Sequence, residues 1–223
     1  MIERRLEPNA APPQVYTLRV VVVGVSPMIW RQLVVPADCT LARLHTTLQL
    51  AFGWTNYYLH QILIHGREFG SLGEPAASAR LAQFRLRRRE KFAYVYNLTD
   101  YWRCEVRLVE IGAAQVGAVY PICVGGRRAA PPEDCGGPEA YMSKLEEHRY
   151  HPPLEALGVL AEAMRRLVDA PDEQSVREAV GDLDEIRDAV DRLRAYDSFE
   201  PGRFRRQALN ARLRSVDANG AHT

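Results

Sequence analysis

Residues 15–53 read VYTLRVVVVGVSPMIWRQLVVPADCTLARLHTTLQLAFG. The first nine are apolar and β-branched enough for a buried strand, and the Gly-Val-Ser-Pro that follows predicts a turn. A second strand is expected over 29–35, because Pro36 cannot continue a ladder of hydrogen bonds. Thr40 is a natural N-cap for a helix over 41–52, where apolar residues recur at helical spacing before a glycine. The chain therefore opens with a strand, strand, helix unit.

The segments that follow predict further strands of the same sheet. One strand is expected over 58–65, and a polar, alanine-rich connection comes after it. The strands expected over 92–98 and 102–111 are joined by the short connection Thr99-Asp100-Tyr101, which is typical of a β-hairpin. An edge strand is expected over 119–124. These elements predict a mostly antiparallel sheet.

The pattern changes to helices from Pro138 onward, because proline is favoured at the first helical position. Helices are expected over 154–168, 175–193 and 203–213, and over 175–193 apolar residues recur every three or four positions. The fold class expected is α+β, with one early helix packed on the sheet and a C-terminal group of helices.

A chain of 223 residues is long enough for one core with a helical appendage. We expect a flexible leader over 1–14 and an α+β core over 15–153. A helical part of the same domain is expected over 154–214, with a disordered tail over 215–223.

The composition is that of an ordinary globular protein. Lys and Arg number 29 against 28 Asp and Glu, so the net charge of +1 gives no overall electrostatic footprint for nucleic acid or an anionic membrane. No apolar run reaches the roughly 20 residues that cross a bilayer, and the first residues lack the apolar core of a secretory signal. The expected location is cytoplasmic, and the four cysteines are expected to be thiols.

Residues 131–137, PPEDCGG, form a rigid acidic loop, since two prolines fix φ and two glycines allow unusual backbone geometry. The side chains of Glu133 and Asp134 could coordinate a cation, act as a base or cap the helix that starts near Pro138, and capping is the favoured interpretation. The adjacent carboxylates would raise the pKa of Cys135, so an idle thiol is expected there.

Several blocks of the chain resemble the plasmid pRiA4b ORF-3-like family. They are IWRQLVVPAD at 29–38, FGW at 52–54, LHQ at 59–61, YVYNLTDYW at 94–102, the acidic loop, and NARL at 210–213. The resemblance implies the α+β fold and a link to mobile DNA, since some relatives are labelled resolvase-like passengers of insertion sequences. The chain departs from the family pattern at four places, which thins its polar set: Tyr58, the Asn-Leu-Thr before Asp100, Cys104 and Ala130. If members of the family have a metal site or an acid–base site, this chain has lost some of the residues that form it.

The function expected is non-enzymatic binding, with no catalytic residue, metal ligand or cofactor assigned. The hypothesised surface for a protein or small-ligand partner comprises His60, Asp100, Trp102, Glu133, Asp134 and Cys135. For Asp100 and Trp102 a structural role at the hairpin tip is the leading interpretation. His45 lies among leucines and is expected to be a hydrogen-bonded core histidine.

Two other function classes remain open. The first is an accessory protein that binds nucleic acid through Arg85, Arg87, Arg88, Arg89 and Lys91, with a second basic group at Arg203, Arg205, Arg206, Arg212 and Arg214. Nucleic acid is a less favoured partner than a protein or small ligand, because charge runs are more often solvated surface. The second is a metal-dependent hydrolase, and no membrane partner is expected.

Overall fold

The structure of the chain is a computed structural model that describes residues 13–170, 172, 174 and 183–220. The chain divides into two compact units. The sheet unit comprises Met1–Glu139 and Gly202–Thr223, and the helical unit comprises Ala140–Pro201. The predicted boundary at 153 falls inside the helical unit. Most of the predicted leader and the last three residues of the predicted tail lie outside the described residues.

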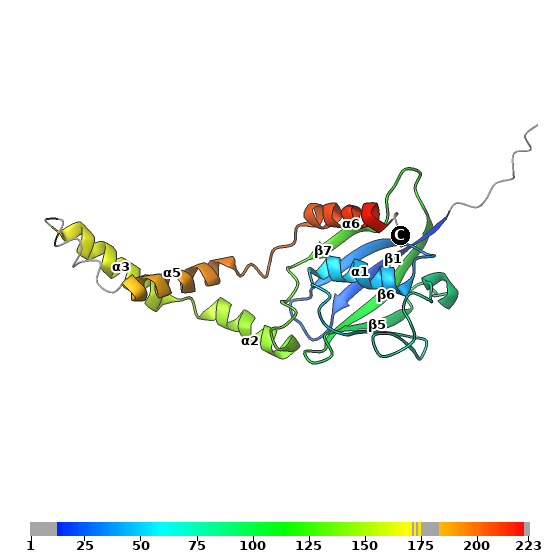
Figure 1. The fold of residues 1–223 in the computed structure, drawn as a ribbon, viewed down its shortest axis with the longest axis horizontal. Coiled ribbons are helices and arrows are strands. Elements are labelled where there is room, and N and C mark those ends of the chain that lie inside the picture. The colour runs from blue at the N-terminus through cyan, green and yellow to red at the C-terminus, as the bar shows by residue number, and fades with distance from the viewer. Residues whose placement is uncertain (1–12, 171, 173, 175–182, 221–223) are drawn as a thin grey trace, which may run out of the picture. The chain divides into compact units, whose positions relative to one another are not determined.

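A seven-stranded antiparallel sheet forms the sheet unit, in the order β4-β3-β5-β6-β1-β2-β7 (Figure 1). The strands are β1 (Gln14–Val22), β2 (Trp30–Pro36), β3 (His60–Ile64), β4 (Arg67–Gly70), β5 (Lys91–Tyr96), β6 (Trp102–Ala113) and β7 (Ile122–Arg127). The predicted α+β class is confirmed. Sequence reasoning missed strand β4 and the short 3₁₀ helix Leu81–Phe84, which are too short to establish a period.

Helix α1 (Leu41–Phe52) lies across one face of the sheet (Figure 1). Its predicted caps are present: Thr40 Oγ1 accepts a hydrogen bond from the Arg43 backbone N–H at 3.1 Å, and Gly53 is left-handed with φ of 71°. Helix α6 (Arg206–Gly220) packs against β7 and α1. Residues 215–220, predicted as tail, continue this helix.

Only one face of the sheet is fully buried. Along β1, the side chains of Leu18, Val20 and Val22 are at most 1% exposed, whereas those of Arg19 and Val21 between them are partly exposed. The same alternation holds along β2 and β6. The buried strand expected at 15–23 is therefore fully buried on one side only, because the run of valines hides a period of two. We call the second side the open face.

Arg31 joins α1 to the sheet from inside the core. Its side chain is 2% exposed and donates hydrogen bonds to the carbonyl oxygens of Ala51, Trp30 and Arg127 at 2.8–3.1 Å. The guanidinium lies 4.0 Å from the ring centroid of Phe204, just before α6. Burial lowers the pKa of Arg31 to about 10, so the cation persists at neutral pH. One charged group thus ties α1, two strands and the C-terminal segment together.

The helical unit contains most of α2 (Gly137–Tyr150), α3 (Leu154–Asp169) and α5 (Leu183–Ser198). Helix α5 runs back beside α3 (Figure 1). The first part of the helix predicted over 175–193 lies outside the described residues. Aromatic contacts join α2 to the end of α5: the rings of His148 and Tyr196 are 4.2 Å apart, and Phe199 meets His148 edge-on. No helix in the described part of the chain has the length and apolarity needed to cross a bilayer.

Candidate functional site

The hairpin tip and the acidic loop of the predicted partner site do meet in space. Asp100 Oδ2 accepts a hydrogen bond from the Gly136 backbone N–H at 2.9 Å. The carbonyl oxygen of Glu133 accepts hydrogen bonds from Asn97 Nδ2 at 2.7 Å and from Trp102 Nε1 at 3.1 Å. Gly137 has φ of +83°, and a Cβ there would lie 2.4 Å from the Asp100 carbonyl oxygen, so only glycine fits this contact.

The Glu133 carboxylate is already occupied by bonds within the protein. It accepts hydrogen bonds from the backbone N–H of Thr55 at 2.8 Å, from the Thr55 hydroxyl, and from the hydroxyl of Tyr96 at 2.7 Å. Burial works against ionisation of Glu133, but these hydrogen bonds outweigh it and lower its pKa. The expected capping of α2 by Glu133 is therefore wrong. Asp100 is the carboxylate that bonds at the start of that helix, because the tip of the β5–β6 hairpin reaches it.

The residues of this junction differ in how far a partner could reach them. Trp102 has no exposed area, which agrees with its expected structural role. Asp134 is exposed and Cys135 partly exposed, beside the exposed Tyr101 of the hairpin tip. The structure thus brings together five of the six predicted partner residues and uses Glu133 and Trp102 to hold the loop in place.

His60, the sixth predicted residue, is partly exposed and stacks on a polar cluster built around the buried His45 and Tyr94. Within this cluster His45, Gln49, Asn56 and Tyr94 form a closed ring of hydrogen bonds. Gln49 Nε2 donates to the Tyr94 hydroxyl at 2.6 Å, and that hydroxyl lies 2.9 Å from His45 Nδ1. The other ring nitrogen, His45 Nε2, lies 2.6 Å from Asn56 Oδ1. The backbone N–H of Asn56 closes the ring by donating to Gln49 Oε1 at 3.0 Å. In the consistent arrangement Tyr94 donates to Nδ1 and His45 carries its proton on Nε2. The expectation of a hydrogen-bonded core histidine is confirmed for His45.

The ring of His60 stacks on that of His45, with 3.6 Å between their centroids. His60 Nδ1 lies 3.3 Å from the Ser71 hydroxyl, while Nε2 is buried without a hydrogen-bond partner among the described residues. Burial, reinforced by the neighbouring His45, lowers the pKa of His60 to about 4. Both histidines are therefore neutral at physiological pH; the side chain of His45 is buried, and that of His60 is partly exposed.

The predicted basic run at 85–91 leads onto the open face of the sheet. Its exposed arginines, Arg85, Arg87, Arg88 and Arg89, precede β5, and Arg88 Nε donates to the Val109 carbonyl oxygen of β6 at 3.3 Å. Lys91 is the first residue of β5 and pairs directly with Arg107 of β6.

A row of cations crosses three neighbouring strands of the open face. Lys91 of β5 is opposite Arg107 of β6, and Arg107 is opposite Arg19 of β1. Strands lie about 4.8 Å apart, so the three positions span on the order of 10 Å. Glu105 pairs with Lys91 at 2.7 Å and with Arg107 at 2.9 Å, whereas Arg19 has no carboxylate partner among the described residues. Like charges placed opposite each other destabilise a sheet, so this row costs stability.

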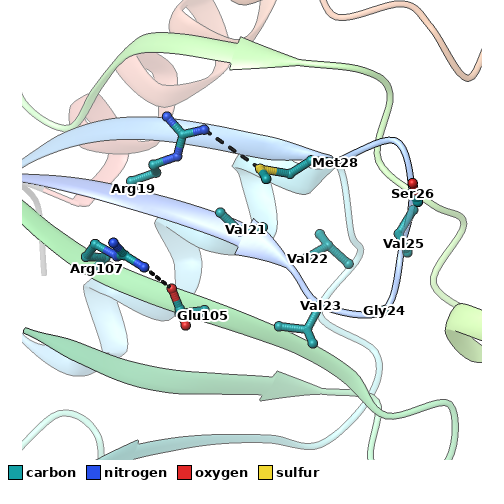
Figure 2. A pocket seen from close by; sticks show the side chains of 10 residues that line it. All are labelled: Arg19, Val21, Val22, Val23, Gly24, Val25, Ser26, Met28, Glu105 and Arg107. Carbon is teal, nitrogen blue, oxygen red and sulfur yellow. Dashed lines mark hydrogen bonds and ion pairs between the residues drawn. The ribbon is translucent and has the colours of Figure 1, made fainter.

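Arg19 lies at a pocket of about 590 Å³ on this face (Figure 2). Its guanidinium stacks over the ring of Trp30 at 4.3 Å, and Nη2 lies 3.8 Å from the sulfur of Met28. Figure 2 shows Arg107 and Glu105 on the neighbouring strand. The other lining residues are mainly apolar and come from the end of β1 and the turn after it: Val21, Val22, Val23, Gly24, Val25 and Ser26. Sequence reasoning missed Arg19, Trp30 and Arg107. The polar residues Thr17 and Arg19, two positions apart, were the available signal of the open face, because the valines around them hide the alternation.

The net charge of +1 conceals opposite charges on the two units. The sheet unit carries 21 Lys and Arg against 13 Asp and Glu, a net charge of +8. The helical unit carries 8 against 15, a net charge of −7. The sheet unit therefore has the excess of positive charge that could attract nucleic acid, although the net charge of the whole chain does not indicate it.

The second basic group, on and before α6, includes residues that attach this segment to the sheet. Arg206 donates to the Val124 carbonyl oxygen at 3.0 Å. Asn210 bonds both backbone groups of Cys123, accepting from N–H at 2.8 Å and donating to C=O at 3.0 Å, as a neighbouring strand would. The side-chain amide thereby occupies part of the edge of β7.

The described residues hold no group of three or more His, Cys, Asp and Glu placed to bind a metal ion. Cys39, Cys104 and Cys123 are buried free thiols. Burial raises the pKa of Cys39 to about 12 and raises those of Cys104 and Cys123 as well. These three thiols are therefore poor nucleophiles.

Residues 14–162 match the family of plasmid pRiA4b ORF-3-like proteins, and the chain belongs to this family. The uncharacterized protein y4hQ of Sinorhizobium fredii (strain NBRC 101917 / NGR234) is 32% identical over 140 residues, which cover 59% of this chain and 72% of y4hQ. The crystal structure of MM3350, a protein of unknown function from Methanosarcina mazei Go1, superposes with a TM-score of 0.64 at 27% identity. That similarity covers 88% of this chain and 97% of MM3350.

Proposed function

We propose that this protein is a non-enzymatic binding protein whose open sheet face binds a polyanion, foremost single-stranded nucleic acid. The observation that carries the proposal is the row of Lys91, Arg107 and Arg19 on adjacent strands. A single carboxylate, that of Glu105, forms ion pairs with this row. A bound chain of phosphates would offset the repulsion within this row. The family takes its name from a plasmid, which agrees with a protein that binds nucleic acid in mobile elements.

The surroundings of the row fit a single strand better than a duplex. Proteins that bind single strands combine a basic surface along the backbone with aromatic and arginine planes on which bases stack. The stacked pair of Arg19 and Trp30 supplies such a plane beside the apolar pocket. The major groove of a duplex is usually read by an α-helix or a two-stranded β-ribbon that enters it, and the open face is a sheet surface rather than such an element.

Fluorescence anisotropy of labelled single-stranded and double-stranded oligonucleotides, titrated over a range of salt concentrations, tests this proposal. We expect the single strand to bind more tightly and its affinity to fall steeply with salt, because bound cations release counterions. The double variant Arg19→Gln, Arg107→Gln should lower the slope of log affinity against log salt by about 1.4, at about 0.7 for each phosphate contact.

The matched control is the double variant Arg212→Gln, Arg214→Gln, which removes the same charge from α6. It should leave the slope nearly unchanged. Equal loss in both double variants would overturn the assignment to the open face, and the absence of binding at low salt would overturn the nucleic-acid proposal itself.

A second candidate is a protein partner at the acidic loop, as the sequence predicts. It is supported by the exposed tyrosines near the loop: Tyr57 is 83% exposed and Tyr101 52% exposed. Burial and then the charges of Asp134, Glu133 and Asp100 raise the pKa of Tyr58, so all three carboxylates act on one aromatic surface. Asp134→Ala should weaken capture of a basic partner without unfolding the protein; an equal loss of stability and binding would contradict this role.

A further inference from the structure

The pocket on the open face forms around one short side chain. Val21 on β1 has Glu105 directly opposite it on β6 and Trp30 directly opposite it on β2. Neighbouring strands lie about 4.8 Å apart, so the backbones of the two longer residues are on the order of 10 Å apart, with the valine between them. Along β1, Arg19 lies at one end of the pocket and the turn of residues 23–28 at the other (Figure 2). The pocket therefore has an apolar floor and polar side chains around it.

The size and lining of the pocket suit a flat ring. Its volume of about 590 Å³ lies within the roughly 300–1,000 Å³ of typical small-molecule sites. Val23 and Met28, which line it, are 42% and 48% exposed, so a ligand with an apolar face would remove this surface from water. Every nucleobase has an apolar face, and its polar atoms are confined to the edge of the ring.

The polar groups of the pocket have hydrogen-bonding capacity that the described residues do not use. Arg107 donates one hydrogen bond, to Glu105, and Arg19 donates only to the sulfur of Met28. A guanidinium has five N–H donors, so most donors of both side chains remain available. The Glu105 carboxylate accepts from Lys91 and Arg107, and about four lone-pair sites leave it further acceptor capacity. Donors and acceptors therefore lie next to each other along β6.

Guanine is the base whose edge complements this arrangement most completely. Its O6 and N7 atoms are adjacent acceptors, which an arginine can bind bidentately. Its N1–H and N2–H groups are adjacent donors, which one carboxylate can accept. No other base places two adjacent acceptor atoms beside two adjacent donor groups. Arg107 and Glu105 are two residues apart on the same side of β6, so one base can meet both side chains.

We propose that this pocket binds a guanine base of a single strand whose phosphates lie along the cationic row. Arg107 donates to O6 and N7, Glu105 accepts from N1–H and N2–H, and Val21 supports the face of the base. Arg19, stacked on Trp30, is left to contact a neighbouring phosphate or base. This inference rests on the proposed function, because it assigns a base preference to the face already proposed to bind single strands.

Fluorescence anisotropy with short oligothymidylates that differ only at the central nucleotide tests the preference for guanine. These strands have the same length and charge, so the contribution of their phosphates is the same. A central guanine should bind about tenfold more tightly than a central thymine, within the range of a good bidentate contact. Hypoxanthine, which lacks the 2-amino group, and 7-deazaguanine, which lacks the N7 acceptor, should each lose part of this preference.

The same titrations separate failure of the pocket from failure of the proposed function. Equal binding of every central base would overturn the guanine site and leave the nucleic-acid proposal in place. No binding of any strand at low salt would overturn both.

The variant Glu105→Gln separates base recognition from electrostatics. Removal of the negative charge should strengthen binding of every strand, but the guanine preference should fall, because an amide has one acceptor oxygen instead of two. The matched control is Glu110→Gln, with the same change in charge at an exposed residue farther along β6, and it should keep the preference. Val21→Phe fills the floor without a change in charge, so it should remove the preference and leave the salt slope of oligothymidylate binding unchanged. A guanine preference that survives both Glu105→Gln and Val21→Phe would overturn the site.

Competition with free nucleotides distinguishes the two sources of the same base. GMP should displace a guanine-containing strand better than AMP does, but only at concentrations far above that of the unlabelled strand, because it lacks the other phosphates that contact the row. GMP that competes as well as the strand would contradict the placement of this base within a bound strand.

Discussion

The sheet unit and the helical unit of this protein are stabilised in different ways. In the sheet unit, large side chains such as Trp102, Tyr94 and Phe69 are fully buried. In the described part of the helical unit, Tyr141 is the one large side chain buried to that degree, and the α3–α5 contact is centred on alanines. The first unit has a hydrophobic core, and the second leaves leucines exposed. We infer that stability resides mainly in the sheet unit and that the helical unit presents a surface.

The largest expected effect is the difference between core truncations in the two units. Trp102→Ala should cost about 3–5 kcal/mol of unfolding free energy, as is usual when a buried aromatic ring is removed. Leu154→Ala in α3 should cost less than about 0.5 kcal/mol, because this side chain is exposed. Urea unfolding measures both; a cost above that of Trp102→Ala for the α3 variant would reverse the comparison.

The probes can separate the units, because all three tryptophans, Trp30, Trp54 and Trp102, lie in the sheet unit. Tryptophan fluorescence therefore reports on the sheet unit, and circular dichroism in the helical bands reports mostly on the other. We expect the dichroism transition to begin at lower urea, since the helical unit buries less. Coincident transitions would indicate that the two units unfold as one.

The next effect concerns neighbouring carboxylates within the acidic loop. Glu133→Ala should cost about 2 kcal/mol, because hydrogen bonds to charged groups contribute about 1.5–3 kcal/mol each and the loop loses its anchor on Tyr96 and Thr55. Asp134→Ala, one residue away and exposed, should cost less than about 0.5 kcal/mol. Thermal unfolding of both variants checks this, and equal losses would mean that the anchoring role is misassigned.

A pH effect is expected from the histidine cluster. In the folded protein the pKa of His60 is about 4, against 6.5 for an ordinary histidine. Between these values the unfolded chain binds more protons, so stability should be full above pH 6.5 and fall as the pH drops toward 4. His60→Gln should flatten this dependence, whereas His151→Gln, at an exposed residue, should not. An unchanged pH profile in the His60 variant would place the proton uptake elsewhere.

The smallest effect is expected on the surface of the helical unit. Glu162 accepts hydrogen bonds from Arg165 and Arg166, which lower its pKa to about 2. Because these side chains are solvated, such pairs contribute little. Glu162→Gln should leave the melting temperature unchanged within error in physiological salt, and a loss as large as that of Glu133→Ala would contradict the distinction between anchored and solvated carboxylates.

Local patterns were enough to predict the strand, strand, helix opening, the hairpin and the early helix caps. Thr40 and Gly53 act within one or two turns of chain, where periodicity and capping rules apply. The contacts of Asn210 with Cys123, and of Glu133 with Thr55 and Tyr96, join residues far apart in the sequence. No local rule predicts such pairs.

The candidate site was harder to predict than the fold for the same reason. The arginines at 85–89 were visible as a run, but the row of Lys91, Arg107 and Arg19 exists only through the strand register. The net charge of +1 likewise concealed the opposite charges of the two units.

The most direct test of the open face is ultraviolet cross-linking of the full chain to a single-stranded oligonucleotide carrying 5-bromodeoxyuridine, followed by mass spectrometry of the linked peptides. We predict cross-links in peptides of β1, β2 and β6, with Trp30 as the main aromatic acceptor. Cross-links confined to α6 or to the helical unit, or no cross-links at low salt, would contradict the assignment of binding to this face.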